Sequence, residues 1–306
     1  MDRLIRTFSV LLAILLVLVS PCRAGEFVKA ESRDVVVLCD ETLSFAARDV
    51  LRIYPRVKAE LESTFMWPVD FTPVVVLVGE RRAFEQMAGN RAFVAYAVPE
   101  KEAIAIDYSR MNVKPFTFEV TLKHELTHLL LHRHITKTVL PAWLDEGVAQ
   151  WISEGIPDLI LPGKESTLSE AAFSGRLFHL DTLTHSFPQD GRGLALAYEE
   201  SRSVVDYIIR NYGKNGVLNI LEAMRRGTGY KEAIEMSLMI TFPELERRWV
   251  KDQRSLSAVL TFLAANLYTI LFIAAALLTF WAYVRFLIRK RRLASIEEDD
   301  EDIPVP

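Results

Sequence analysis

The chain has 306 residues, of which half are hydrophobic, and its formal net charge is −4 at pH 7. Basic residues are dispersed or gathered in one short stretch near the C-terminus, which excludes the broad basic surface of a nucleic-acid-binding protein. With two cysteines in the whole chain, neither a disulfide framework nor a cysteine-based metal site is expected.

The N-terminus carries an uninterrupted apolar run, Phe8–Val19, with Arg3 and Arg6 before it. This pattern is typical of a secretory signal peptide, and the run is too short to be a comfortable membrane span. Small residues at the −3 and −1 positions place the cleavage after Ala24. Residues 1–24 are therefore predicted to be a signal peptide, with an uncleaved N-terminal anchor as the alternative.

Residues 25–113 mix β-branched runs with helical spacing and are predicted to form an α/β lobe. Cys39 closes one of the apolar runs, so we expect it to be buried in a strand. The elements predicted for this lobe are strands at 35–39 and 74–78, a helix at 43–65, and a hairpin of strands at 92–98 and 103–108.

The pentapeptide from His124 to His128 has the pattern H-E-x-x-H. Residues i and i+4 of an α-helix share one face, so both imidazoles can reach one metal ion. Glu125 is rotated by about 100° and can reach a water molecule on the open side of that ion. Zinc held by three protein ligands keeps a fourth position for water and lowers its pKa to about 7. The pattern predicts Glu125 as general base, with a chance match as the alternative.

An apolar stripe at i, i+4, i+7 and i+8 spacing accompanies the pentapeptide, with the histidines on roughly the opposite side. We therefore expect one face of this helix to pack into the core and the other to present the ligands. The stripe consists of Leu122, Leu126, Leu129 and Leu130.

Two residues compete for the role of third ligand, and the first is His134. It stands six residues after His128, where the metzincin pattern has its third histidine, but that pattern needs a glycine where this chain has Leu131. His132 and His134 are more simply explained as cationic residues at the end of a helix.

Glu146 is the favoured third ligand, with an ordinary solvated glutamate as the plain alternative. A second helix is predicted to begin after Pro141. Its buried stripe, Leu144, Val148, Trp151 and Ile152, leaves Glu146 on the other side, facing the first helix. Gly147 is expected to let the two helix backbones approach closely.

The stretch from Glu119 to about Asp252 resembles the gluzincin clan of zinc peptidases, in particular the peptidase MA-like group. The specific matches are His124-Glu125-Leu126-Thr127-His128 and Trp143-Leu144-Asp145-Glu146-Gly147-Val148-Ala149; looser ones lie at 197–201, 207–213 and 242–249. The resemblance implies Zn²⁺ ligands at His124, His128 and Glu146, with Glu125 catalytic. It also implies a zincin-like α+β fold, in which a mixed-sheet lobe precedes a mainly helical lobe.

Residues 114–254 are predicted to be the helical lobe, with further helices near 194–212, 217–225, 231–237 and 242–254. Other gluzincins take an oxyanion donor from a Tyr or His well after the third ligand. Tyr198 is the preferred donor here and His185 and His179 are alternatives; a Tyr198 that only packs in the core is the plain interpretation. By the same resemblance, the hairpin Ala95–Asp107 either borders the substrate cleft or only closes the sheet.

Residues 255–284 contain no charged side chain, and residues 255–287 are predicted to be one transmembrane helix. Trp281 and Tyr283 stand where an interfacial aromatic belt is expected, and five basic residues follow between Arg285 and Arg292. The positive-inside rule makes this end cytoplasmic, so the domain at 25–254 lies outside the cytoplasm. Residues 288–306 are predicted to be a cytoplasmic tail, basic and then acidic, and its acidic part, 296–306, is expected to be solvated and too polar to fold alone.

The favoured interpretation is a single-pass, membrane-anchored zinc metallopeptidase with a peptide or protein substrate. Its catalytic domain faces a periplasm, an envelope surface or a secretory lumen. One alternative is a catalytically silent zincin fold that binds a peptide or a partner protein. A second is a scaffold whose acidic tail contacts a cytosolic partner.

Overall fold

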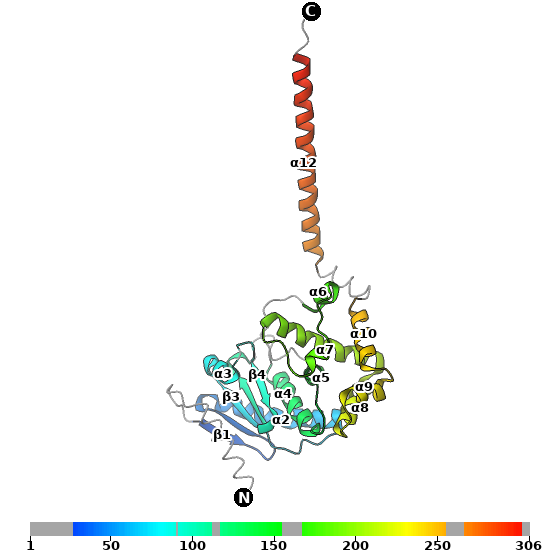
Figure 1. Ribbon diagram of the computed structural model, residues 1–306. Helices are drawn as coiled ribbons and strands as arrows, with labels where there is room; N and C mark the ends of the chain where they lie inside the picture. Colours follow the sequence, from blue (N-terminus) through cyan, green and yellow to red (C-terminus); the bar gives the residue numbers. More distant parts are fainter. Residues whose placement is uncertain (1–26, 90, 112–116, 155–166, 255–265, 302–306) are drawn as a thin grey trace, which may run out of the picture. The chain divides into compact units, whose positions relative to one another are not determined.

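The computed structural model describes residues 27–89, 91–111, 117–154, 167–254 and 266–301 (Figure 1). The predicted signal peptide at 1–24 and the start of the predicted membrane segment, 255–265, lie outside these ranges. The chain divides into two compact units, Met1–Val250 and Lys251–Pro306.

The first unit contains a five-stranded mixed sheet in the order β1-β2-β3-β5-β4. The central strands β2, β3 and β5 are parallel, while β1 and β4 pair antiparallel at the two edges. Parallel strands are buried on both faces, which explains the continuous apolar runs in the sequence. The strands are β1 (Phe27–Glu31), β2 (Val36–Asp40), β3 (Val74–Val78), β4 (Ala95–Val98) and β5 (Ala103–Asp107).

Alternation along the central strands divides their side chains between the two faces of the sheet. Val75, Leu77 and Ile104 belong to the large core cluster on one face, together with residues of α2 (Ser44–Phe65). Val76 and Val78 belong to a smaller cluster on the other face, with Phe84 of α3 (Arg81–Ala88) at its centre.

The remainder of the first unit is mainly helical, which confirms the predicted α+β class with a mixed sheet followed by helices. The predicted helix boundaries agree with the structure to within a few residues. These helices are α4 (Phe118–His134), α5 (Ala142–Ser153), α6 (Thr167–Ser174), α7 (Gly191–Tyr212), α8 (Lys214–Arg225), α9 (Tyr230–Leu238) and α10 (Phe242–Gln253).

Besides four 3-10 helices of three residues each, three elements within the described ranges were not predicted: β1, α3 and α6. Each of the three is short, five or eight residues. In α3 only Phe84 is fully buried, and Ala83, Met87 and Ala88 pack partly buried around it. Elements of this kind are stabilised by the neighbours they pack against rather than by their own sequence.

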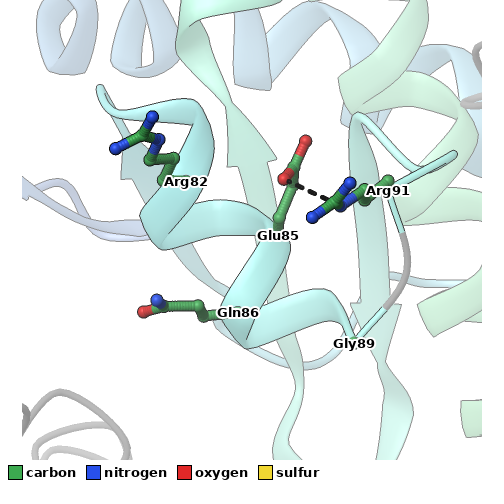
Figure 2. A pocket seen from close by; sticks show the side chains of 5 residues that line it. All are labelled: Arg82, Glu85, Gln86, Gly89 and Arg91. Atoms are coloured by element: carbon green, nitrogen blue, oxygen red, sulfur yellow. Dashed lines mark ion pairs between the residues drawn. The ribbon is translucent and has the colours of Figure 1, made fainter.

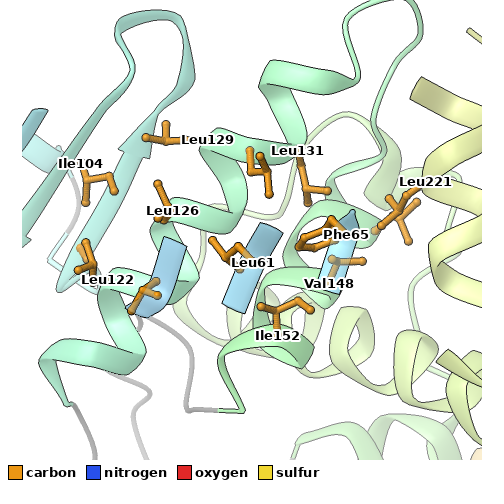
Figure 3. Packing of buried hydrophobic residues seen from close by; sticks show 14 of the residues in the cluster. Leu61, Phe65, Ile104, Leu122, Leu126, Leu129, Leu131, Val148, Ile152 and Leu221 are labelled. Carbon is orange, nitrogen blue, oxygen red and sulfur yellow. The ribbon is translucent and has the colours of Figure 1, made fainter. Parts of the chain in front are cut away.

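Helix α4 is buried on nearly all sides: as expected, one face packs into the core and the other presents the histidines to Glu146 of α5. The leucine side packs into the core with α2 and the sheet, as Figure 3 shows for Leu122 and Leu126 beside Ile104 and Leu61. The opposite side is covered by α5, and it leaves His124 only 1% exposed. The sequence predicted both the apolar stripe and a second helix facing the histidines, but not how completely that helix buries them.

The second unit contains α12 (Leu267–Glu301), whose segment Leu267–Arg289 is long and apolar enough to cross a membrane. The helix continues to Glu301, so the described part of the predicted tail is helical as a continuation of the apolar segment rather than by itself. Arg, Lys, Leu, Ala and Glu are good helix formers, and no Gly or Pro occurs between Leu267 and Ile303. A helix begun in the apolar segment can therefore propagate through them.

Two glutamates hold the segment between α6 and α7 by accepting its backbone N–H groups, Glu200 from Phe178 at 3.0 Å and Glu246 from Leu180 at 2.8 Å. A third, Glu199, accepts from the N–H of Leu168 in the first turn of α6 at 2.7 Å. The Glu200 side chain is fully buried, and its Oε2 has no hydrogen-bond partner in the part of the chain that the structure describes.

Burial raises the pKa of Glu200 to about 8; the Phe178 N–H opposes this shift, and the charges of Glu246 and Glu199 add to it. At pH values between 4.5, the ordinary pKa, and about 8, Glu200 holds a proton in the folded chain and has released it in the unfolded chain. The free energy of unfolding is therefore highest below pH 4.5. It falls as the pH rises from 4.5 to about 8, by at most about 1.4 kcal/mol per pH unit.

Replacement of Glu200 by Gln is expected to flatten this pH dependence and to stabilise the chain at pH 8 relative to the parent. Denaturant titrations at several pH values between 5 and about 8.5 measure it. Glu235→Gln, a change at an exposed glutamate of α9, is the matched control. Parallel stability curves for Glu200→Gln and the parent would contradict the expectation.

Candidate metal centre

The two histidines of the H-E-x-x-H sequence lie one turn apart on the same face of α4. Their Nε2 atoms are 3.2 Å apart, and their ring centroids are separated by 4.9 Å. The helix thus presents two imidazole nitrogens to one point, as the i, i+4 spacing requires.

Helix α5 brings the Glu146 carboxylate to the same point. Its Oε1 is 3.5 Å from Nε2 of His124, and its Oε2 is 3.8 Å from Nε2 of His128. Glu146 is 5% exposed, so this carboxylate is buried beside the two imidazoles rather than solvated. The antiparallel packing of α4 and α5 brings together the three residues that the sequence proposed as ligands.

The spacing of these donors fits a single metal ion. One ligand atom from each residue can be chosen so that all lie within 4.8 Å of one another. A tetrahedral ion with bonds of about 2.0–2.1 Å separates neighbouring ligand atoms by roughly 3.3–3.4 Å. The separations of 3.2, 3.5 and 3.8 Å bracket that value. Two imidazoles and a carboxylate form a donor set that divalent zinc accepts.

Asp145, the residue before Glu146, holds the histidine ring from its other side. Nδ1 of His128 donates to Oδ1 of Asp145 at 2.8 Å, and Nε2 of His132 donates to Oδ2 at 2.9 Å. An ionised carboxylate only accepts hydrogen bonds, so both imidazoles are donors here. A proton on Nδ1 of His128 leaves its Nε2 directed at Glu146 and His124. Sequence reasoning did not assign Asp145; an acidic neighbour of the predicted ligand was the available signal.

The electrostatics of the cluster follow from burial and from these pairs. Burial opposes ionisation of Asp145, but His128 and His132 hold its pKa well below the ordinary value. Burial alone would lower the pKa of His128, but Asp145, Glu146 and Glu125 outweigh burial and raise it to about 10. Burial lowers the pKa of His124 well below its usual range. Imidazole coordinates a metal only when deprotonated, so metal binding at His128 releases a proton.

Glu125 and Gln150 complete the immediate surroundings. Glu125 is 1% exposed and lies close enough to help raise the pKa of His128. Gln150, one turn after Glu146 on α5, donates from Nε2 to Glu146 Oε1 at 2.8 Å and to the backbone oxygen of Tyr198 at 3.2 Å. This amide fixes the carboxylate and ties it to α7. It was not assigned from the sequence.

The three proposed oxyanion donors, Tyr198, His179 and His185, differ in burial and in their connection to the metal cluster. Tyr198 is 6% exposed and packs its ring against Phe187 at a centroid distance of 5.4 Å. Its backbone is joined to the cluster through Gln150. His179 and His185 are exposed, and Nδ1 of His179 lies 3.3 Å from Glu246. Of the three, Tyr198 is the one that the hydrogen bonds join to the metal cluster.

The rival third ligand lies elsewhere. Nε2 of His134 donates to the backbone oxygen of Pro68 at 2.9 Å, and its ring lies 5.1 Å from that of Trp67. His132 is engaged with Asp145. Neither histidine belongs to the group of ligand atoms formed by His124, His128 and Glu146.

Gly147 serves a close approach, but its partner is α7 rather than α4. A Cβ atom at this position would lie 2.3 Å from the backbone oxygen of Ser201 and 2.6 Å from Cγ2 of Val205. Helix α5 packs between α4 and α7. Consecutive residues of a helix differ in direction by about 100°, so Glu146 faces α4 while Gly147 faces α7. The expectation that Gly147 brings α4 and α5 together is therefore wrong.

An open cavity of about 440 Å³ lies on α3 and the loop that follows it (Figure 2). Glu85 in this cavity lies 3.6 Å from the exposed Arg91. None of its lining residues belongs to α4 or α5, so it is separate from the metal cluster. The lining consists of Arg82, Glu85, Gln86, Gly89 and Arg91.

Comparison with known proteins places this site in a family. No curated protein matches the chain significantly. Among solved structures, the crystal structure of Legionella pneumophila aminopeptidase A in complex with aspartic acid is similar at 13% identity and a TM-score of 0.47. The similarity covers 74% of this chain but 28% of that one, so the chain spans under a third of that protein. The family model described as the Peptidase MA superfamily matches residues 84–254, more than half of the chain and all of the metal cluster. The chain belongs to the Peptidase MA superfamily, with a zincin-like metallopeptidase fold.

Proposed function

We propose that the protein is a zinc-dependent peptidase that hydrolyses peptide or protein substrates. One observation carries the proposal: ligand atoms of His124, His128 and Glu146 converge beside the buried Glu125, in a chain of the Peptidase MA superfamily. The donor set favours zinc, with imidazole nitrogens and a carboxylate oxygen as ligands.

The chain's own residues have separate roles in the proposed reaction. Bound zinc lowers the pKa of a coordinated water to about 7 and polarises a carbonyl. Glu125 accepts the proton of the attacking water and passes it to the leaving amine as the peptide C–N bond breaks. Asp145 keeps His128 in the tautomer that leaves Nε2 available, and Gln150 holds the carboxylate of Glu146.

The edge strand β4 is the proposed binding surface for the substrate backbone. It is the last strand in the sheet order, and α4 packs against it. An extended peptide can add to such an edge by main-chain hydrogen bonds, which would align it along the helix that carries the histidines. A strand that only closes the sheet is the alternative.

The arrangement in the cell is proposed from the second unit and the termini. Residues 1–24 are a signal peptide, 25–254 an extracytoplasmic peptidase domain, 255–287 a membrane span, and 288–306 a cytoplasmic tail. The apolar segment Leu267–Arg289 supports the span by its length and composition. The guanidinium of Arg285 lies 5.1 Å from the ring centroid of Trp281, an aromatic–basic pair suited to a membrane interface.

A catalytically silent zincin fold that binds a partner is the second function considered. A purely structural metal site needs three or four ligands but no general base. The presence of Glu125, buried beside His124 and His128, therefore favours the enzyme.

Zinc content tests the proposed ligand set. The full chain, purified in detergent, is expected to hold about one zinc per molecule, and Glu146→Ala to retain it far more weakly. Glu235→Ala, at an exposed glutamate of α9, is the matched control and should resemble the parent. Cleavage of a peptide mixture should stop with a chelator and return with zinc. A parent without zinc, or full retention in Glu146→Ala, would refute the proposed site.

Replacement of Tyr198 by Phe is expected to lower turnover by about 10²–10³-fold if the hydroxyl stabilises the oxyanion, with zinc content unchanged. Steady-state kinetics and metal analysis measure the two quantities. Tyr207→Phe is a close control, because Tyr207 lies on the same helix and is also 6% exposed. Equal turnover in the two variants would remove Tyr198 from the mechanism.

A further inference from the structure

A second imidazole, from His132, binds the carboxylate that orients a proposed zinc ligand. Asp145 uses its two oxygens separately, Oδ1 for Nδ1 of His128 and Oδ2 for Nε2 of His132. The side chains of His128 and Asp145 are 15% and 16% exposed, whereas that of His132 is 40% exposed. His128, Asp145 and His132 therefore form a hydrogen-bonded row that leads from the buried metal cluster to the protein surface.

The placement of these residues follows from the packing of two helices. His124, His128 and His132 lie at successive turns of α4, while Asp145 and Glu146 are consecutive on α5. One turn of α5 therefore holds His128 from both sides, with Asp145 at Nδ1 and Glu146 near Nε2. Any rotation of the Asp145 carboxylate changes the direction in which Nε2 of His128 points.

His132 supplies the hydrogen bond that restrains this rotation. A carboxylate fixed through one oxygen can still turn about its own bond, whereas donors at both oxygens define its plane. The charged acceptor makes both hydrogen bonds stronger than neutral ones. The next histidine of α4, His134, donates to the backbone oxygen of Pro68 instead and has no part in this set.

We propose that His132 is a positioning residue of the metal centre, which acts through Asp145 on the orientation of His128. The inference rests on the proposed zinc site and adds a residue that the ligand pattern does not include. His132 does not belong to the group of ligand atoms, so its removal should change how tightly zinc is held rather than which residues hold it.

The rate at which zinc leaves the full chain, followed with a chromogenic chelator, tests this role. His132→Ala is expected to accelerate release by about tenfold, the lower end of the effect of outer-shell partners. His132→Gln, which keeps an N–H near the same position, should restore the rate to within about threefold of the parent. Alanine is a good helix former at a partly exposed position, so the variant should fold. His134→Ala is the matched control and should not accelerate release comparably.

A double variant shows whether His132 acts through Asp145 or whether its removal merely destabilises helix α4. In an Asp145→Ala background, the further change His132→Ala should leave the release rate unchanged, because the shared partner is already gone. Two results would overturn the inference. One is equal zinc-release rates in His132→Ala and His134→Ala; the other is a double variant in which the separate effects of Asp145→Ala and His132→Ala multiply. Neither result would contradict zinc binding or peptidase activity in the parent. A parent that binds no zinc would refute the proposed function and this inference together.

Discussion

Glu125→Gln is expected to lower peptide turnover by about 10²–10⁴-fold while zinc content stays at the parental level. Glutamine has nearly the shape of glutamate but cannot accept the proton of the attacking water. Glu125 is 1% exposed, so another base from solvent cannot easily replace it. Turnover of a peptide mixture, measured beside metal analysis on the same sample, gives both quantities.

Glu119→Gln provides the control for this experiment. Glu119 begins the same helix and pairs with Arg56 at a partly exposed position, away from the histidines. Its replacement should leave turnover near the parental level. Full activity in Glu125→Gln would rule out the general-base role. Zinc retained by a parent that cleaves nothing would favour the silent, partner-binding fold.

Gly147→Ala is expected to destabilise the chain by about 3 kcal/mol or more and to weaken zinc binding at the same time. The added methyl would lie 2.3 Å from the backbone oxygen of Ser201 and 2.6 Å from a side-chain carbon of Val205. A side chain can rotate away, but a backbone oxygen inside α7 can move only with its helix. Helices α5 and α7 must therefore separate, and Glu146 moves with α5.

Denaturant unfolding and zinc release measure the two effects in the same variant. Gly191→Ala is the control, because a Cβ atom there would have nothing within 4 Å. Alanine should be tolerated at that position or should even stabilise the first turn of α7. Similar stability of the two variants would show that α5 and α7 can adjust at little cost.

Much of the fold could be predicted because most strands and helices show a regular spacing of apolar residues along the chain. The β-branched runs predicted β2 and β3, and the alternating small residues predicted the hairpin of β4 and β5. The apolar spacing predicted α7, α8, α9 and α10. Prediction failed for β1, α3 and α6, because elements of five or eight residues give too short a pattern and are supported by contacts with the rest of the chain.

Some features of the candidate site could likewise be predicted from the sequence, and others depend on how the helices pack. The pairing of His124 with His128 depends only on the geometry of one helix, so the sequence is sufficient to predict it. The approach of Glu146 depends on a short connection between two antiparallel helices, which the apolar stripe of α5 indicated. The bonds of Asp145 to His132 and of Gln150 to Tyr198 depend on how the helices rotate against each other.

The amino-acid sequence by itself was enough to predict the helix that carries His124 and His128, the α+β order and the apolar segment near the C-terminus, and to propose Glu125 as the general base. Each depends on residues that are close along the chain. Tertiary structure alone decided that Gly147 faces α7 and that Asp145 binds two histidines at once. The physical reason is packing: α5 lies between α4 and α7, and its rotation is set by all the side chains it buries against both neighbours.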